Sequence, residues 1–234
     1  MSKLQEMIDF WDDFAQEYTT IQNESQTNIT QDVIAFLTKQ AIFPTSSLLD
    51  LAGGSGKYIK GFLPFVEQYV FVDFSKEMIR IAQKKNTDKK IVFLKQDQAT
   101  FFKETKNQSY DIVFSAMNPA LTTQNDLDEL LRIAKKRVYL LRLVSDEDLI
   151  FSHLEEEYPN LMANYKEWLK RPYHSTKFVY RLEEEVEKAF FFDYFEGEIP
   201  FDKLEEVAKI RFKNEKYFLN QRKIVFELLE ISTE

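Results

Sequence analysis

The sequence contains no cysteine, only two histidines and only five glycines among its 234 residues. The absence of cysteine excludes disulfides, thiolate nucleophiles and cysteine-based metal sites, and it is compatible with a reducing compartment. His153 and His174 occur outside any H-x-x-x-H arrangement, and no paired-carboxylate pattern accompanies them. We therefore expect no metal site.

Long apolar runs and a basic excess are also lacking. The stretches Tyr69–Val72 and Val138–Leu141 are cut short by Asp73 and Arg142, well below the roughly 20 residues that a membrane helix needs. Met1–Tyr18 lacks the basic start, apolar run and cleavage site of a signal peptide. The net charge of −8 repels phosphate backbones. These features predict a cytoplasmic protein without a membrane partner, and they disfavour nucleic acid as a partner.

Hydrophobic periodicity distinguishes an amino-terminal helical segment from a following segment in which strands and helices alternate. Apolar residues recur at helical spacing between Met7 and Tyr18, and Thr30 can cap a second helix. From Ser47, short apolar runs alternate with helical segments, which is the pattern of a doubly wound parallel sheet. The expected strands are Leu48–Ala52, Tyr69–Asp73, Ile91–Lys95, Asp111–Ala116 and Val138–Leu143.

The carboxy-terminal half is less regular. Helical spacing is found at Leu149–Leu154, Leu161–Leu169 and Phe178–Phe190, and the run Glu183–Glu185 fits a solvated helix face. Phe192–Phe201 is a candidate sixth strand.

The last segment, Lys203–Ile231, has two interpretations. It can be helical, or it can form a hairpin of Val207–Lys213 with Lys223–Ile231. Both alternatives stay open on the sequence alone.

A turn of small residues, Ala52-Gly53-Gly54-Ser55-Gly56, follows the first expected strand. Glycines there let the backbone turn tightly and bring free N–H groups close to a ligand. A P-loop is excluded because Lys57 precedes Tyr58 and Leu51 occupies the position of its first glycine. The G-x-G-x-x-G spacing of dinucleotide sites is not met either. What remains is an acidic residue, Asp50, before a turn of small residues.

The next three strands also end in polar side chains. Asp73 and Phe74 end the second strand, Asp97 and Gln98 follow the third, and Ser115 lies near the end of the fourth. These positions meet at one edge of a parallel sheet, where open α/β sheets bind ligands. Asp73 and Asp97 also fit a plain helix cap and a plain turn position.

In this order, the features resemble the motifs of class I S-adenosylmethionine (SAM)-dependent methyltransferases, with Ala52 at the first glycine of D-L-G-x-G-x-G. The resemblance covers Trp11–Val144. It implies SAM as the cofactor and an α/β, doubly wound, mostly parallel seven-stranded Rossmann-like sheet with a helical amino-terminal lid and carboxy-terminal additions. The cofactor-binding residues that it implies are Tyr18, Asp50, Ala52, Gly53, Gly54, Gly56, Asp73, Phe74, Asp97, Gln98 and Ser115.

The resemblance also suggests roles. Asp73 would hold the ribose, Asp97 the adenine amino group and the turn Gly53–Gly56 the amino-acid end, while Ser115 would lie under the sulfonium. Tyr18, on the lid, would close over the cofactor, although it also fits the core stripe of an amphipathic helix. The expected organisation is a single domain, 1–234, with a lid at 1–44, a SAM-binding core at 45–145 and substrate-side helices in 146–234.

Two departures from the family pattern bear on function. Ala52 is a mild change if its φ is negative, because a methyl group is costly only in left-handed backbone. Asn118-Pro119-Ala120-Leu121 is similar to the D/N-P-P-Y/F motif of amino-directed enzymes but lacks its second proline and its aromatic residue. We interpret it as a proline-stiffened loop.

The expected function is methyl transfer from SAM to a small-molecule acceptor, with no identifiable catalytic residue. The acceptor cavity is expected between the amino-terminal helix, the loop Met117–Leu121 and the segment Arg171–His174. A non-catalytic SAM-binding scaffold and a methyltransferase acting on RNA or protein are the alternatives. The sequence predicts no oligomeric state.

Overall fold

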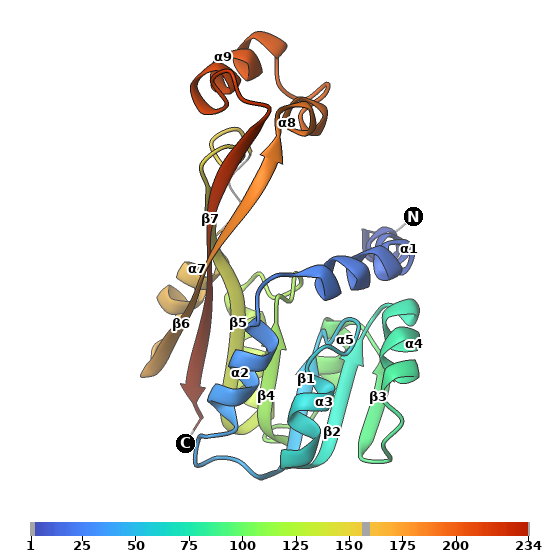
Figure 1. The fold of residues 1–234 in the computed structure, drawn as a ribbon. Helices are drawn as coiled ribbons and strands as arrows, with labels where there is room; N and C mark the ends of the chain where they lie inside the picture. The colour runs from blue at the N-terminus through green and yellow to red at the C-terminus, as the bar shows by residue number, and fades with distance from the viewer. Residues whose placement is uncertain (1–2, 156–159, 234) are drawn as a thin grey trace. The chain divides into compact units, whose positions relative to one another are not determined.

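The computed structural model describes residues 3–155 and 160–233, so the outermost parts of the predicted ranges 1–44 and 146–234 lie outside the described residues. Figure 1 shows the arrangement of the helices and strands. In chain order they are α1 (Lys3–Glu24), α2 (Ile29–Leu37), β1 (Thr45–Leu51), α3 (Ile59–Phe62), a 3₁₀ turn (Leu63–Phe65), β2 (Val66–Asp73), α4 (Lys76–Lys85), β3 (Ile91–Lys95), α5 (Gln98–Glu104), β4 (Tyr110–Ala116), α6 (Gln124–Ile133), β5 (Ala134–Asp148), α7 (Leu161–Trp168), β6 (Tyr173–Glu187), α8 (Lys188–Tyr194), α9 (Phe201–Arg211) and β7 (Tyr217–Ser232).

The strands form one seven-stranded sheet in the order β3-β2-β1-β4-β5-β7-β6. The neighbours from β3 to β5 are parallel, whereas β7 runs antiparallel to the strands beside it (Figure 1). The strand order changes direction between β1 and β4, which is the switch point where open α/β sheets bind ligands. The predicted α/β class and the mostly parallel sheet of seven strands are confirmed.

The chain divides into two compact units, and the long strands β5, β6 and β7 contribute to both. The first unit comprises residues 1–142, 161–177 and 227–234. The second comprises residues 143–160 and 178–226. The predicted single-domain organisation stays a prediction.

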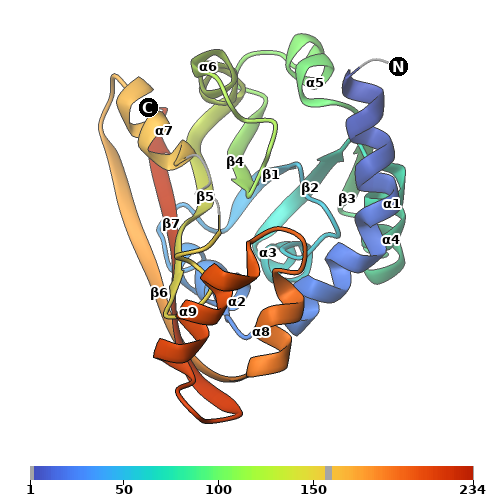
Figure 2. The ribbon, with the colours of Figure 1, turned by 90° about the horizontal axis from the view of Figure 1, so that it is seen from above.

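The core of the first unit is built around strands that carry apolar side chains on both faces. Six of the seven residues of β1 are buried, as expected for a parallel strand covered on both sides. A further apolar cluster joins α1 to α4 (Figure 2), where Ala15 packs with Met78 and Ile81 beneath Trp11 and Tyr18. The five expected strands between Leu48 and Leu143 are confirmed as β1 to β5.

The helical predictions for the amino-terminal part and for Leu161–Leu169 are confirmed as α1, α2 and α7. The predicted cap at Thr30 is wrong, because α2 already begins at Ile29 and its N-cap residue is Asn28. The helical prediction for Leu149–Leu154 is also wrong, since that segment forms bends and turns.

The prediction of a helix at Phe178–Phe190 is wrong, because the segment up to Glu187 forms strand β6. Its apolar residues were spaced four apart, and four is both close to one helical turn and two full periods of a strand. Burial along β6 alternates residue by residue. The run Glu183–Glu185 therefore lies on a strand and not on a helix face.

The prediction of a strand at Phe192–Phe201 is wrong as well. This segment contains the end of α8, a turn and the first residue of α9. Lys203–Ile231 contains parts of both alternatives. Its first part is helical, as α9, and its second part is the reversed last strand, β7. The neighbours of β7 in the sheet are β5 and β6, and the expected strand Val207–Lys213 is not among them.

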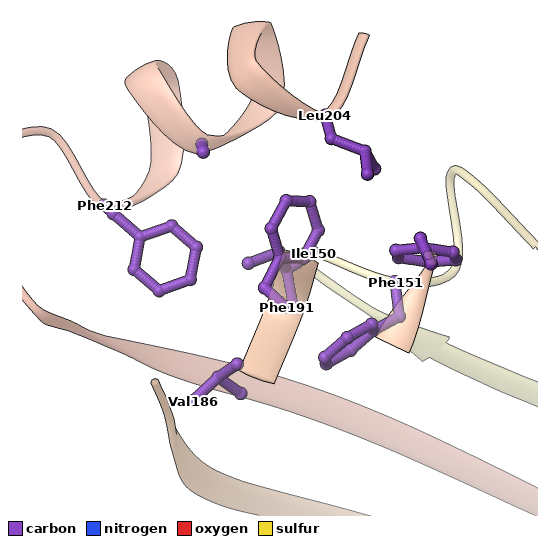
Figure 3. Packing of buried hydrophobic residues seen from close by; sticks show 8 residues of the cluster. Ile150, Phe151, Val186, Phe191, Leu204 and Phe212 are labelled. Carbon is purple, nitrogen blue, oxygen red and sulfur yellow. The ribbon is translucent and has the colours of Figure 1, made fainter. Parts of the chain in front are cut away.

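An aromatic core holds the second unit together (Figure 3). Phe191 and Phe195, one helical turn apart, lie against Phe212 and Leu204 of the following helical segment and against Phe151. The spacing of these buried rings is compatible with helix α8, because residues four apart lie on one face of a helix.

We predict that Phe191→Ala lowers the free energy of unfolding by about 3–5 kcal/mol, because it leaves a cavity in this core. Phe191 is fully buried, whereas its neighbour Phe190 is 55% exposed. Phe190→Ala is therefore the matched control and should cost less than about 1 kcal/mol. Urea denaturation measures both changes, and equal losses for the two variants would contradict this description of the core.

Candidate functional site

The turn after β1 is fastened to the tip of β2. The carboxylate of Asp73 accepts a hydrogen bond from the backbone N–H of Gly54 at 2.8 Å and another from Ser75 at 2.9 Å. The N–H of Gly53 donates to the carbonyl of Val72 at 3.1 Å. Two neighbouring strands thus end in one hydrogen-bonded structure, a direct link between Asp73 and the glycine turn that the sequence analysis did not predict.

Two glycines of this turn are required for different reasons. A Cβ atom at Gly53 would lie 2.2 Å from the ring of Phe71, so any side chain there would displace the core. Gly54 has a φ of +57°, and no atom lies within 4 Å of the position that its Cβ would take. The backbone at Gly54 is therefore open to space into which a ligand can fit.

The expectation for Ala52 is wrong. Its φ is +60°, in the left-handed region, whereas we expected a negative value. A methyl group in that region costs roughly 1–2 kcal/mol because Cβ crowds the following carbonyl oxygen. Replacement of the family's glycine by alanine therefore strains the turn.

Asp50 is almost completely buried, at 1% exposure, and accepts a hydrogen bond from the Tyr69 hydroxyl at 2.6 Å. Burial raises the pKa of Asp50 to about 7; the bond from Tyr69 opposes this shift and the charge of Asp73 adds to it. In the structure Asp50 thus joins β1 to β2, and its role toward a cofactor stays a prediction.

Asp73 is the second buried carboxylate, at 6% exposure. Burial raises the pKa of Asp73 to about 6, the hydrogen bonds from backbone N–H groups oppose that shift, and the charge of Asp12 adds to it. Phe74 follows at once and is half-buried. Each oxygen of Asp73 keeps acceptor capacity beyond these bonds, because a carboxylate offers about four lone-pair sites.

Helix α1 is anchored to this edge by polar contacts. The Ser55 hydroxyl donates to the Gln22 side chain at 3.0 Å. The Ser75 hydroxyl, at the N-cap of α4, donates to Asp12 at 2.6 Å. Tyr18 lies between these anchors along α1, and both burial and the nearby charge of Asp73 raise its pKa. Tyr18 also packs against the apolar cluster of Ala15, Met78 and Ile81, as the core-stripe interpretation allows, and its closing over a cofactor stays a prediction.

A second network crosses the switch point from β1 to β4. The Ser115 hydroxyl donates to the carbonyl of Leu51 at 2.9 Å and accepts from the Asn118 side chain at 3.2 Å. Asn118 also donates to Gln98 at 2.8 Å, and Gln98 donates to the side chain of Asp126. Ser115 and Gln98, predicted from separate strands, thus belong to one network.

Asp97 caps helix α5, because its side chain accepts from the backbone N–H of Thr100 at 3.0 Å. Partial burial works to raise the pKa of Asp97, but the hydrogen bonds centred on Thr100 outweigh it and lower the pKa. Asp97 is therefore a helix cap, whereas the alternative that we considered for it was a plain turn position; contact with an adenine stays a prediction.

The loop Met117–Leu121 is held in place from two sides. Arg142 donates to the carbonyl of Asn118 at 2.6 Å, and the Tyr165 hydroxyl of α7 donates to the carbonyl of Leu121 at 2.6 Å. Met117 itself has a φ of +54°, a strained value for a long side chain. This loop is therefore rigidly placed directly after β4, as the proline interpretation predicts.

A cavity of about 450 Å³ lies elsewhere in the first unit, beside α6 and the end of α7. It includes Arg171 of the predicted acceptor segment, but neither α1 nor the loop Met117–Leu121 lines it. Tyr173 and His174 begin β6 and are exposed. The predicted acceptor cavity is thus distinct from this one and stays a prediction.

Three residues of the site were missed from the sequence. Asp12, Gln22 and Tyr69 look like ordinary members of a helix or a strand, and only the fold brings them to Ser75, Ser55 and Asp50. The described parts of the chain, residues 3–155 and 160–233, contain no cluster of three or more metal-ligating side chains. No helix within these ranges is long and apolar enough to cross a membrane.

Comparison with known proteins agrees with this geometry. Residues 48–138 match the family model of a methyltransferase domain. Comparison of the chain with curated proteins finds no match.

Solved structures with the same fold include three bacterial proteins. A proposed type II methyltransferase from Anaeromyxobacter dehalogenans has a TM-score of 0.54 and 14% identity, over 87% of this chain and 96% of that chain. The YcgJ protein from Bacillus subtilis has a TM-score of 0.52 and 14% identity, over 85% and 98%. A proposed methyltransferase from Bacillus halodurans C-125 has a TM-score of 0.51 and 14% identity, over 87% and 99%.

The strand order, with its last strand reversed, is that of the class I Rossmann-like methyltransferase fold. The family match lies over β1 to β5, where the glycine turn and Asp73 are placed. Residues 48–138 are accordingly a SAM-dependent methyltransferase domain, and SAM is its cofactor. The resemblance read from the sequence is confirmed.

We predict that Ala52→Gly raises the free energy of unfolding by about 0.5–1 kcal/mol, because relief of left-handed strain exceeds the added flexibility of the unfolded chain. Ala99→Gly is the control: Ala99 lies in helix α5, where glycine should cost about 0.5–1 kcal/mol. Thermal and urea unfolding measure both variants. A loss of stability in Ala52→Gly comparable to that in the control would contradict the strained turn.

Proposed function

We propose that this protein transfers the methyl group of SAM to a small-molecule acceptor. The observation that carries the proposal is the convergence of Asp73, the glycine turn and Tyr18 at the carboxyl edge of β1 and β2. That edge lies beside the switch point between β1 and β4, the usual ligand position in this class of fold.

The residues at this edge suit the cofactor. Asp73 has acceptor capacity left for ribose hydroxyl groups, and the open space beside Gly54 leaves room for close approach of a ligand to the backbone. We assign the amino-acid end to the turn Ala52–Gly56 with Asp50 behind it, and the adenine to Phe74, Asp97 and Gln98. Ser115 is assigned to the sulfonium side of the site.

Helix α1 is proposed as the lid. Its anchors, Gln22 to Ser55 and Asp12 to Ser75, fasten it to the turns that end β1 and β2. Tyr18 lies between these anchors along α1 and is assigned to closing over the cofactor. A lid of this kind excludes water and restricts the space for an acceptor, which favours a small molecule over a macromolecule. The net charge of −8 argues in the same direction.

The acceptor side is assigned to the loop Met117–Leu121, which Arg142 and Tyr165 hold rigid. When bound, SAM supplies a methyl group activated by its sulfonium. The protein's task is then to align the acceptor atom with that methyl group, so a positioning loop matters more than a nucleophilic side chain. A cysteine-free chain carrying this chemistry suits the cytoplasm, where we place it.

We predict that Asp73→Asn weakens binding of S-adenosylhomocysteine by about 1.5–3 kcal/mol, the usual loss for hydrogen bonds to a charged acceptor. Gly54 and Ser75 donate to different oxygens of Asp73, so asparagine keeps an acceptor for only one of these two backbone N–H groups. Isothermal titration calorimetry measures the affinity, and urea denaturation reports the folding of each variant.

The matched control is Asp88→Asn, an exposed loop carboxylate that precedes β3. It should bind as the wild type does. A folded Asp73→Asn protein with unchanged affinity would exclude Asp73 as the ribose ligand, and a wild type that binds neither SAM nor its product at millimolar concentration would overturn the site.

The acceptor class is tested with SAM labelled on its methyl group. We expect label to enter a small-molecule fraction of a cell extract when wild-type protein is added, and not with Gly54→Arg, which fills the open space beside the turn. Label in RNA or protein alone would contradict the small-molecule acceptor. Binding of SAM without any transfer would favour a non-catalytic scaffold.

A further inference from the structure

Strand β6 forms an edge of the sheet. Among the described residues its only neighbouring strand is β7. It is 15 residues long, and alternate side chains along it are exposed, including Val179 at 44%. A long exposed edge presents a row of unpaired backbone groups that another strand can join.

The pairing of β6 with β7 shows which backbone groups face outward. The N–H of Lys188 donates to the carbonyl of Lys216 at 2.9 Å. Side-chain bonds from Asn220 to Glu184 and from Gln221 to Glu183 keep the same register. Antiparallel partners alternate in the direction of their backbone groups, so the even-numbered residues of β6 bond to β7. The odd-numbered residues, from 179 to 185, direct their N–H and C=O groups outward.

The same odd-numbered residues carry an ordered set of charges. Arg181 is followed on that face by Glu183 and Glu185, and all three side chains are exposed. When a second copy of the strand is laid antiparallel with Leu182 opposite Leu182, each Arg181 lies opposite Glu183 of the other copy. Glu185 of the other copy then lies on the diagonal, within reach of the long arginine.

We propose that this protein forms a symmetric dimer through antiparallel pairing of β6 with β6 of a second copy. The register pairs outward-facing residues only with outward-facing residues, as the ladder requires. The two-fold symmetry makes the Arg181–Glu183 pair occur twice, so the interface is isologous. The dimer joins the two sheets at their edges.

A second copy is favoured over other occupants by this charge order. Parallel pairing of two copies would set each outward-facing residue opposite an inward-facing one, so Arg181 would not lie opposite Glu183. Antiparallel pairing satisfies both charges with no partner other than the chain itself. The proposal does not depend on the methyltransferase activity.

The experiment is sedimentation velocity over a concentration series with wild type, Arg181→Glu and Glu183→Arg. We expect a wild-type dimer and, for each variant alone, a dissociation constant about 10- to 100-fold higher, because like charges then oppose each other at both symmetric positions. An equimolar mixture of the two variants should recover the dimer, since each then supplies the charge that the other needs.

Lys203→Glu is the matched control: it makes the same change of charge at an exposed position of α9 and should dimerise as the wild type does. Circular dichroism verifies that all variants are folded. A monomeric wild type, single variants that dimerise as the wild type does, or a mixture of folded variants that stays monomeric would each overturn the proposal.

Discussion

The hydrogen bond from the N–H of Gly54 to the carboxylate of Asp73 is the interaction on which the site depends. It fixes the turn after β1 against the tip of β2, and so it determines where the open space beside Gly54 lies. The same carboxylate accepts from Ser75, whose hydroxyl in turn holds Asp12 of α1. The glycine turn, the start of α4 and the amino-terminal helix therefore share one anionic anchor.

Burial of that anchor has an electrostatic cost. The pKa of Asp73 is raised to about 6 and that of Asp50 to about 7, mainly by burial. Because these values exceed the ordinary aspartate pKa near 3.9, the folded protein binds more protons than the unfolded chain in that range. The stability that the protonated carboxyl groups of Asp50 and Asp73 contribute is fully present below about pH 4. It is lost as the pH rises through about 6 to 7. At neutral pH Asp73 is mostly ionised and Asp50 only partly so, and this poorly solvated negative charge favours a cationic ligand such as SAM.

The sequence predicted correctly those parts of the fold in which the pattern of apolar residues favours one kind of element. Short continuous apolar runs such as Tyr69–Val72, repeated between helical segments, favour strands covered on both faces, and polar residues at the ends of parallel strands meet at one edge. The spacing from Phe178 to Phe190 satisfied both a helix and a strand, and pairing with β7 decided it. Contacts made across the fold, such as Asp12 with Ser75, leave no local pattern, so no reading of the sequence could find them.

Strained backbone is a second feature of the sheet edge at which β1 and β4 end. Ala52 and Met117 follow the ends of β1 and β4, and both adopt left-handed φ values without being glycine. These two strands are neighbours at the switch point, where Ser115 bonds to the carbonyl of Leu51. Strain of this kind persists only where surrounding contacts over-determine the backbone, as the hydrogen bonds to Gly53, Gly54 and Asn118 do here. The glycine turn and the loop assigned to the acceptor are thus held in fixed positions at the ends of two neighbouring strands, which is what alignment for methyl transfer requires.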